Sequence, residues 1–136
     1  MTLVKAQLNG LRMSPRKVRL LVGLIKRRSV AVAIDQLQNM TKRASGPLVK
    51  LIESAIANAK NNFKLDADHL FVKDMWVDEG IKLRRFRPKG FGRASPIEKK
   101  TSRVNLVLED RAPKVAAPEV VEEKPEKKKK AATKKA

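Results

Sequence analysis

The chain has 136 residues, which fits one domain, and it contains no cysteine, so a disulfide framework, a thiolate zinc site and a catalytic thiol are excluded. Its longest apolar run covers residues 20–25 and is far shorter than the roughly 20 residues of a membrane span, so no membrane partner is expected. The net charge of +18 instead favours a polyanionic partner, and a nucleic acid above all. We expect neither a secretory signal nor a transit peptide in the first ten residues.

The positive charge is distributed unevenly along the chain. Residues 1–43 carry ten basic side chains and one acidic one, and residues 80–103 carry nine basic side chains and one acidic one. Residues 44–79 have a net charge of −2, and the stretch from Arg111 to the end has +5. The sequence therefore predicts a nearly neutral core flanked by two basic surfaces and a basic tail.

The first predicted elements are a short edge strand over residues 3–8 and a helix that begins at Ser14-Pro15. Serine is positioned to cap the first free amides, and proline is harmless at the first helical position. The apolar residues of this helix recur at three- and four-residue spacing, as Val18, Leu21, Val22 and Ile25. Basic residues occupy the other side, so the exposed face of the helix is expected to be cationic.

Two further helices are predicted before residue 63. Ser29 is a candidate cap for a short helix that forms a helical hairpin with the first one, and its stripe is Val30, Ala33, Ile34 and Leu37. The third helix begins either at Thr41 with a distorted first turn or near Gly46, because Pro47 lacks a backbone donor. Its stripe runs through Leu48, Leu51, Ile52, Ala55, Ile56 and Ala59 and is expected to end at Asn61-Asn62.

From Leu70 the apolar period changes to two, which predicts a strand. One side would carry Phe71, Lys73, Met75 and Val77, and the other Leu70, Val72, Asp74 and Trp76. A lone tryptophan in an alternating strand is more often core than a stacking platform, so Trp76 is expected in the core. Alternation of Val104, Leu106 and Leu108 predicts a second strand, and the segment that joins the two strands contains the turn residues Pro88-Lys89-Gly90 and Gly92. We expect this segment to form a long two-stranded ribbon that projects from the sheet.

The segment 80–103 is the most informative part of the chain, because its basic residues alternate with Phe86, Phe91 and three glycines. So much repulsion requires an anionic partner, with cations for phosphates and flat side chains for bases. The two phenylalanines either contact the nucleic acid or pack across the ribbon, and the sequence does not decide between these interpretations.

The tail over 112–136 consists of alanine, glutamate and lysine runs separated by prolines, and it is expected to be disordered when free. It is either a solvated, solubilising tail or a weak nonspecific RNA contact. The remainder, residues 1–111, is the predicted globular RNA-binding domain, with its extended hairpin at about 80–103.

No catalytic, cofactor or metal site is predicted. His69 is the only histidine and is expected to lie in a surface turn, because one imidazole beside two loop carboxylates lacks the usual set of metal ligands. Asp74, Asp78 and Glu79 are expected to pair with cations or to set a turn. Gly90-Phe91-Gly92 is only a fragment of a phosphate-binding loop and is interpreted as a turn.

Several motifs together resemble the bacterial family of large-subunit ribosomal protein twenty-two. They are Ser54-Ala55-Ile56-Ala57-Asn58-Ala59, Val77-Asp78-Glu79-Gly80, the hairpin positions Pro88, Gly92, Arg93 and Ala94, and Lys99 with Thr101-Ser102. The resemblance covers about residues 3–111 in order and spacing. It implies an α+β fold of three helices packed on a small three-stranded antiparallel sheet, with a long projecting hairpin, which agrees with the predicted elements.

The resemblance also implies a function without catalysis or cofactor. The family binds large-subunit rRNA early in assembly beside neighbouring ribosomal proteins, in the large subunit of the cytoplasmic ribosome, and its hairpin lines the exit tunnel that the nascent polypeptide traverses. The expected globular RNA surface is Arg12, Arg16, Lys17, Arg19, Lys26, Arg27 and Arg28. The expected hairpin contacts are Lys82, Arg84, Arg85, Arg87, Lys89, Arg93, Lys99, Lys100 and Arg103. The expected tunnel-facing tip is Phe86, Arg87, Pro88, Lys89, Gly90, Phe91, Gly92 and Arg93.

Two other functions fit the composition. A DNA-bending architectural protein would also carry a basic β-arm with a proline near its tip, although such proteins usually dimerise and no homo-oligomer is expected here. A small metal-dependent nuclease would use Asp74, Asp78 or Glu79, and we expect no such activity.

Overall fold

The structure is a computed structural model that describes residues 2–111, so the lysine-rich tail expected over 112–136 lies outside the described residues. In chain order the elements are β1 (Leu3–Leu11), α1 (Pro15–Ile25), α2 (Val30–Gln38), α3 (Ser45–Phe63), β2 (Leu70–Glu79), β3 (Leu83–Pro88), β4 (Ala94–Lys99) and β5 (Ser102–Asp110). Single 3₁₀ turns cover Ala67–His69 and Gly90–Gly92. His69 is exposed in the first of these turns, as expected.

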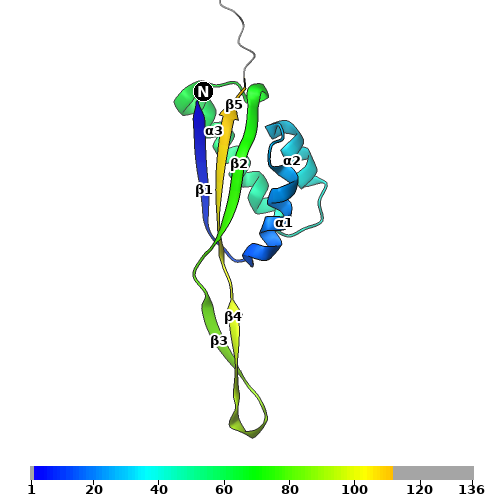
Figure 1. The fold of residues 1–136 in the computed structure, drawn as a ribbon, viewed down its shortest axis with the longest axis vertical. Coiled ribbons are helices and arrows are strands. Elements are labelled where there is room, and N and C mark those ends of the chain that lie inside the picture. Colours follow the sequence, from blue (N-terminus) through cyan, green and yellow to red (C-terminus); the bar gives the residue numbers. More distant parts are fainter. Residues whose placement is uncertain (1, 112–136) are drawn as a thin grey trace, which may run out of the picture.

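The main sheet has the order β1-β5-β2 with both pairings antiparallel, and β3 and β4 form a separate two-stranded ribbon (Figure 1). Helix α3 packs against β1, α1 packs against β2, and α2 packs mainly on α3. This arrangement confirms the expected α+β class. Because β5 lies between two neighbours, its apolar residues Val104, Leu106 and Leu108 are almost completely buried.

The core is built from the apolar stripes of the helices and the inner face of the sheet. The predicted face of α1 is buried at Val18, Leu21, Val22 and Ile25. On α3, the small residues Ala55 and Ala59 are fully buried, which lets the helix backbone approach the sheet closely. No helix in the described part of the chain has the length and apolar character needed to cross a membrane.

The helix ends agree with the prediction in position, but the expected serine caps are not formed. Ser14 and Ser29 hold the N-cap positions with extended backbone, but neither side chain makes a cap hydrogen bond. Helix α3 begins at Ser45, so the start near Gly46 is the alternative that the structure adopts. Pro47 then lies in the first turn, where its missing N–H costs no helical hydrogen bond. The helix ends at Phe63, just after the predicted asparagines, and Lys64 follows in the left-handed region with φ 53°.

A β-bulge in β2 overturns the prediction for Trp76. The register with β5 shifts between Val72 and Asp74, so the residues that face the core change parity from Leu70 and Val72 to Met75 and Val77. Trp76 therefore points away from the helices and is 45% exposed, where uninterrupted alternation placed it beside Val72. The alternation of buried and exposed side chains holds on each side of the bulge, but the bulge reverses which positions face the core.

The bulge lies where the turn between α1 and α2 docks on β2. The N–H of Arg27 donates to the carbonyl of Val72 at 2.9 Å, and the N–H of Val72 donates to the carbonyl of Arg28 at 2.9 Å. The Lys26 ammonium lies 2.7 Å from Asp74 Oδ1, which also accepts the N–H of Met75 at 2.7 Å. One carboxylate thus holds both the bulged backbone and the end of α1.

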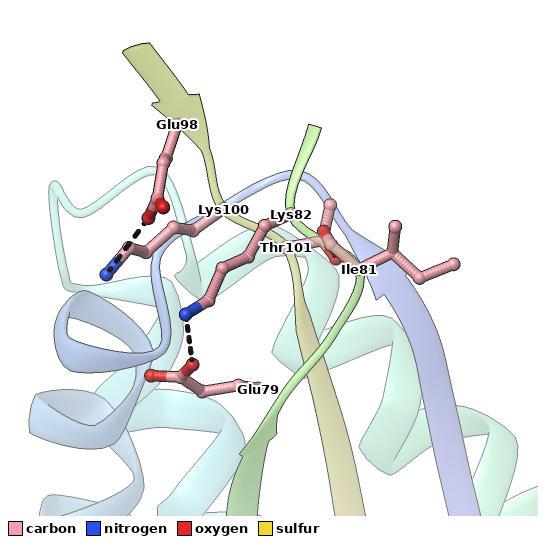
Figure 2. Close-up of polar contacts among 6 residues, drawn as sticks. All are labelled: Glu79, Ile81, Lys82, Glu98, Lys100 and Thr101. Carbon is pink, nitrogen blue, oxygen red and sulfur yellow. Dashed lines mark hydrogen bonds and ion pairs between the residues drawn. The ribbon is translucent and has the colours of Figure 1, made fainter. Parts of the chain in front are cut away.

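The ribbon leaves the sheet through a short neck, where β2 continues into β3 and β4 continues into β5 (Figure 1). Gly80 N–H donates to the carbonyl of Thr101 at 2.9 Å, and the Thr101 hydroxyl donates to the carbonyl of Ile81 at 2.7 Å. Figure 2 shows Thr101 and Ile81 facing each other across this neck. A Cβ on Gly80 would overlap Thr101 Oγ1, so the close crossing requires glycine.

The Lys26–Asp74 pair predicts a specific dependence of stability on pH. The pKa of Asp74 is lowered, mainly by the hydrogen bond from Lys26, while partial burial opposes this shift and the Met75 N–H adds to it. Because the folded pKa lies below the unfolded one, the stabilisation is complete above about pH 4 and is lost as the pH falls through the folded value.

We expect the difference in unfolding free energy between the wild type and Asp74→Asn to shrink as the pH falls from about 4 toward 2. Urea denaturation across this range measures the effect, which for an exposed pair is about 1 kcal/mol or less. Asp35→Asn, at an exposed aspartate of α2, is the control. A constant difference at every pH would contradict the linkage.

The neck predicts that loss of one hydroxyl loosens the ribbon. Thr101→Val keeps the shape of the side chain and removes its hydrogen bond to Ile81, so we expect a loss of about 1 kcal/mol in the free energy of unfolding. The amide of Gly80, which donates to the carbonyl of Thr101, is expected to exchange faster with solvent deuterium, whereas Thr101→Ser restores slow exchange. Equal exchange in the valine variant and the wild type would show that the hydroxyl does not fix the neck.

Candidate nucleic-acid interface

The two faces of the projecting ribbon carry different side chains. The register pairs Arg85 with Ile97 and Arg87 with Ser95, whereas Phe86 pairs with Pro96. Because side chains alternate along a strand, one face carries Leu83, Arg85, Arg87, Ser95, Ile97 and Lys99. The other face carries Arg84, Phe86, Pro88, Ala94, Pro96 and Glu98. The first face is mainly cationic, and the second has an apolar centre.

The tip is a turn with no core behind it. The N–H of Lys89 donates to the carbonyl of Arg93 at 2.8 Å and closes the loop, while Phe91 and Gly92 both adopt left-handed backbone, with φ 57° and 69°. Every residue expected at the tip is exposed, which comprises Phe86, Arg87, Pro88, Lys89, Gly90, Phe91, Gly92 and Arg93. The tip is thus ordered by its own turn and by the neck, with all its side chains left for contacts outside the protein.

The two phenylalanines differ in their surroundings. Phe86 lies opposite Pro96 in the ribbon and is 75% exposed, so cross-strand packing covers only a small part of its ring. Phe91 lies in the turn, beyond the last strand pair, and is fully exposed. Cross-strand packing therefore does not account for Phe91, and an external contact is the remaining interpretation for that ring.

Two of the cations near the neck, Lys82 and Lys100, are ion-paired within the protein. Lys82 lies 3.2 Å from Glu79, and Lys100 lies 3.9 Å from Glu98, as Figure 2 shows. The hydrogen bond from Lys82 is the main reason that the pKa of Glu79 is lowered, and the charges of Lys100 and Arg19 act in the same direction. Within residues 2–111, no ion pair joins an acidic group to the cations farther along the ribbon, namely Arg84, Arg85, Arg87, Lys89 and Arg93.

The basic residues of the globular part also divide into engaged and free groups. The Arg19 guanidinium donates to the carbonyl of Val77 at 2.9 and 3.1 Å, Lys26 pairs with Asp74, and Arg28 Nε donates to the carbonyl of Leu24 at 3.0 Å. In the described part of the chain, Arg12, Arg16 and Lys17 are exposed and have no side-chain partner, whereas the charge of Arg27 acts on Asp74. Arg19 thus fixes α1 to the end of β2, a structural role that its place on a cationic helix face did not indicate.

The structure brings together two basic surfaces that are far apart in the sequence. A groove of about 1120 Å³ lies between α1, the loop after α2 and the end of β4. Its lining includes Arg12 and Lys17 from the first basic surface and Lys99 and Lys100 from the hairpin. It also includes Lys42 and Arg43, which the sequence reasoning did not select. The only indication of their role in the sequence was that they belong to the basic stretch of residues 1–43.

The carboxylates near the basic surfaces have structural partners. Asp74 holds the bulge, Glu79 pairs with Lys82, and Asp78 accepts a hydrogen bond from Asn105 Nδ2 at 2.9 Å. Residues 2–111 contain no group of three or more histidine, aspartate or glutamate side chains placed to hold a metal ion. The arrangement can therefore bind anions on two joined surfaces.

The comparisons with known proteins agree with this geometry. The family model for ribosomal protein L22p/L17e matches residues 6–109. The large ribosomal subunit protein uL22 of Mesoplasma florum is 53% identical over 106 residues, which cover 78% of this chain and 95% of that protein. The uL22 proteins of Bdellovibrio bacteriovorus and Lactobacillus gasseri are 44% and 47% identical, with 79% of this chain and 98% and 92% of theirs covered. The chain belongs to the ribosomal protein L22p/L17e family.

Proposed function

We propose that this chain is a structural, non-enzymatic protein of the large ribosomal subunit that binds large-subunit rRNA during assembly and places its hairpin at the wall of the nascent-polypeptide exit tunnel. The observation that carries the proposal is the projecting ribbon with unpaired cations and no core. A ribbon of this kind gains little from its own protein, so its binding energy must come from a partner that surrounds it. Family membership favours this proposal over the DNA-bending alternative.

The physical mechanism is neutralisation of phosphates. RNA helices that converge repel one another, and arginine and lysine side chains between them release the condensed counterions. The globular surface with Arg12, Arg16 and Lys17 holds one RNA region, and the ribbon reaches a second region more deeply. The protein thereby links rRNA segments beside neighbouring ribosomal proteins, within the cytoplasmic ribosome.

The two faces of the ribbon support a division of contacts. The face with Arg85 and Arg87 suits phosphates, because planar guanidinium groups bridge phosphate oxygens with two hydrogen bonds. The Phe91 ring lies in the turn at the tip and is fully exposed, so it is not packed against the ribbon. We assign the cationic face and the cations of the tip to rRNA, and the ring of Phe91 to the tunnel lumen, where the nascent chain passes.

The cationic ribbon predicts a change in the salt dependence of RNA binding. Arg87→Ala with Arg93→Ala removes two unpaired charges, so the slope of log K against log salt is expected to become shallower by about 1.6 on large-subunit rRNA fragments. Filter binding between low and moderate salt measures the slope. Lys50→Ala with Lys60→Ala removes the same charge from exposed positions of α3 and is expected to leave the slope nearly unchanged. Equal slopes for both double variants would overturn the assignment of the ribbon, and tighter binding to bent duplex DNA would favour the alternative.

The division of contacts predicts different crosslinks from two positions of the ribbon. The natural chain lacks cysteine, so Phe91→Cys and Arg85→Cys each provide a single site for a photoreactive group. In ribosomes that carry a stalled nascent chain, position 91 is expected to crosslink to the nascent polypeptide and position 85 to rRNA. Absence of nascent-chain crosslinks from position 91 would contradict the placement of the tip.

A further inference from the structure

The groove between α1, the loop after α2 and the end of β4 has features that general phosphate binding does not require. Residues 39–44 form one wall, α1 forms the other, and Lys99 and Lys100 close one end. Figure 1 shows the loop after α2 passing beside α1 at the end of the domain from which the hairpin projects. With about 1120 Å³, the groove exceeds the roughly 300–1,000 Å³ of pockets that hold a single small ligand.

The charge of the groove selects an anionic occupant. Its lining contains six cations and no acidic residue, namely Arg12, Lys17, Lys42, Arg43, Lys99 and Lys100. All six are exposed, and among the described residues only Lys100 has an ion-pair partner, at 3.9 Å. Such a concentration of one sign of charge attracts a polyanion into the groove.

The floor of the groove is apolar. Leu20 is 71% exposed and Leu24 is 46% exposed on the groove side of α1, and the half-buried Met13 and Met40 flank them. A double-stranded RNA helix presents phosphates and sugars, whereas its base faces are stacked inside. Only an unpaired segment presents phosphates and apolar base faces together.

The loop wall is fixed before any ligand binds. The hydroxyl of Ser45 lies 2.6 Å from the carbonyl of Lys42 and 3.2 Å from that of Met40, and the N–H of Ser45 donates to Lys42 at 2.9 Å. Ser45 is itself buried. Lys42 and Arg43 are therefore held on a preorganised turn, which reduces the entropy lost on binding.

We propose that this groove binds an unpaired segment of large-subunit rRNA, with base faces on Leu20 and Leu24 and phosphates on Lys42, Arg43 and the neighbouring cations. This inference depends on the proposed binding of large-subunit rRNA, and it adds the kind of RNA structure that the groove selects. An acidic segment of a neighbouring ribosomal protein is the competing occupant, and it would satisfy the cations without using the apolar floor as a stacking surface.

Crosslinking within assembled large subunits identifies the occupant. A benzophenone attached to Leu24→Cys is expected to react with rRNA nucleotides that are unpaired in the subunit, whereas Ala57→Cys, on the exposed side of α3, is the control. Crosslinks from position 24 to a ribosomal protein, or only to base-paired nucleotides, would overturn the proposal. Failure of both labelled proteins, and of the wild type, to enter large subunits would instead refute the proposed function.

Binding of the full chain to rRNA fragments provides the second readout. Leu20→Ala with Leu24→Ala is expected to weaken binding about fivefold or more with an unchanged salt slope, because apolar contact between the leucines and the base faces is lost and no phosphate contact is removed. Lys42→Ala with Arg43→Ala is expected to make the slope shallower by about 1.4. Masking the unpaired nucleotides with a complementary oligonucleotide should remove the difference between the leucine variant and the wild type. Wild-type affinity in the leucine variant would overturn the stacking floor while leaving the hairpin assignment intact.

Discussion

The antiparallel pairing of β2 with β5 is the interaction on which the rest of the structure depends. Both strands continue past the end of the sheet, so the direction of the ribbon is set by the same ladder that holds the core. Gly80 and Thr101 connect the sheet to the ribbon at the neck. The two segments approach so closely there that a side chain at position 80 would overlap Thr101. The helices pack on one face of the sheet and stabilise this ladder. The orientation of the basic ribbon is therefore fixed by the packing of the nearly neutral core.

The distribution of charge separates folding from binding. Apolar burial on the inner face of the sheet supplies the main favourable free energy of folding. Several cations near the core or the neck have a partner within the protein, such as Asp74, Glu79 or a backbone carbonyl. Among the described residues, the cations of the outer ribbon and, apart from Lys100, those of the groove have no acidic partner. Their mutual repulsion opposes compaction of the free protein, and in the proposed complex the rRNA phosphates would relieve it.

Local patterns in the sequence predicted the parts of the fold that depend on neighbouring residues. The buried face of α1, the existence of the strand β5 and the turn at Pro88 to Gly92 all followed from spacing and turn chemistry. The parity change in β2 could not be predicted, because the bulge depends on a turn some 45 residues earlier that docks on Val72. The contribution of Lys42 and Arg43 was missed for the same reason, since their loop meets Lys99 and Lys100 only in three dimensions.

The backbone of Phe91 has a consequence for how the tip is designed. A residue other than glycine in the left-handed region is strained by about 1–2 kcal/mol, and a fully exposed aromatic ring recovers none of this by burial. Within the free protein, glycine or asparagine at position 91 would satisfy the same turn with less strain. The turn at Phe91 thus stores a small amount of backbone strain that no contact within the described residues repays.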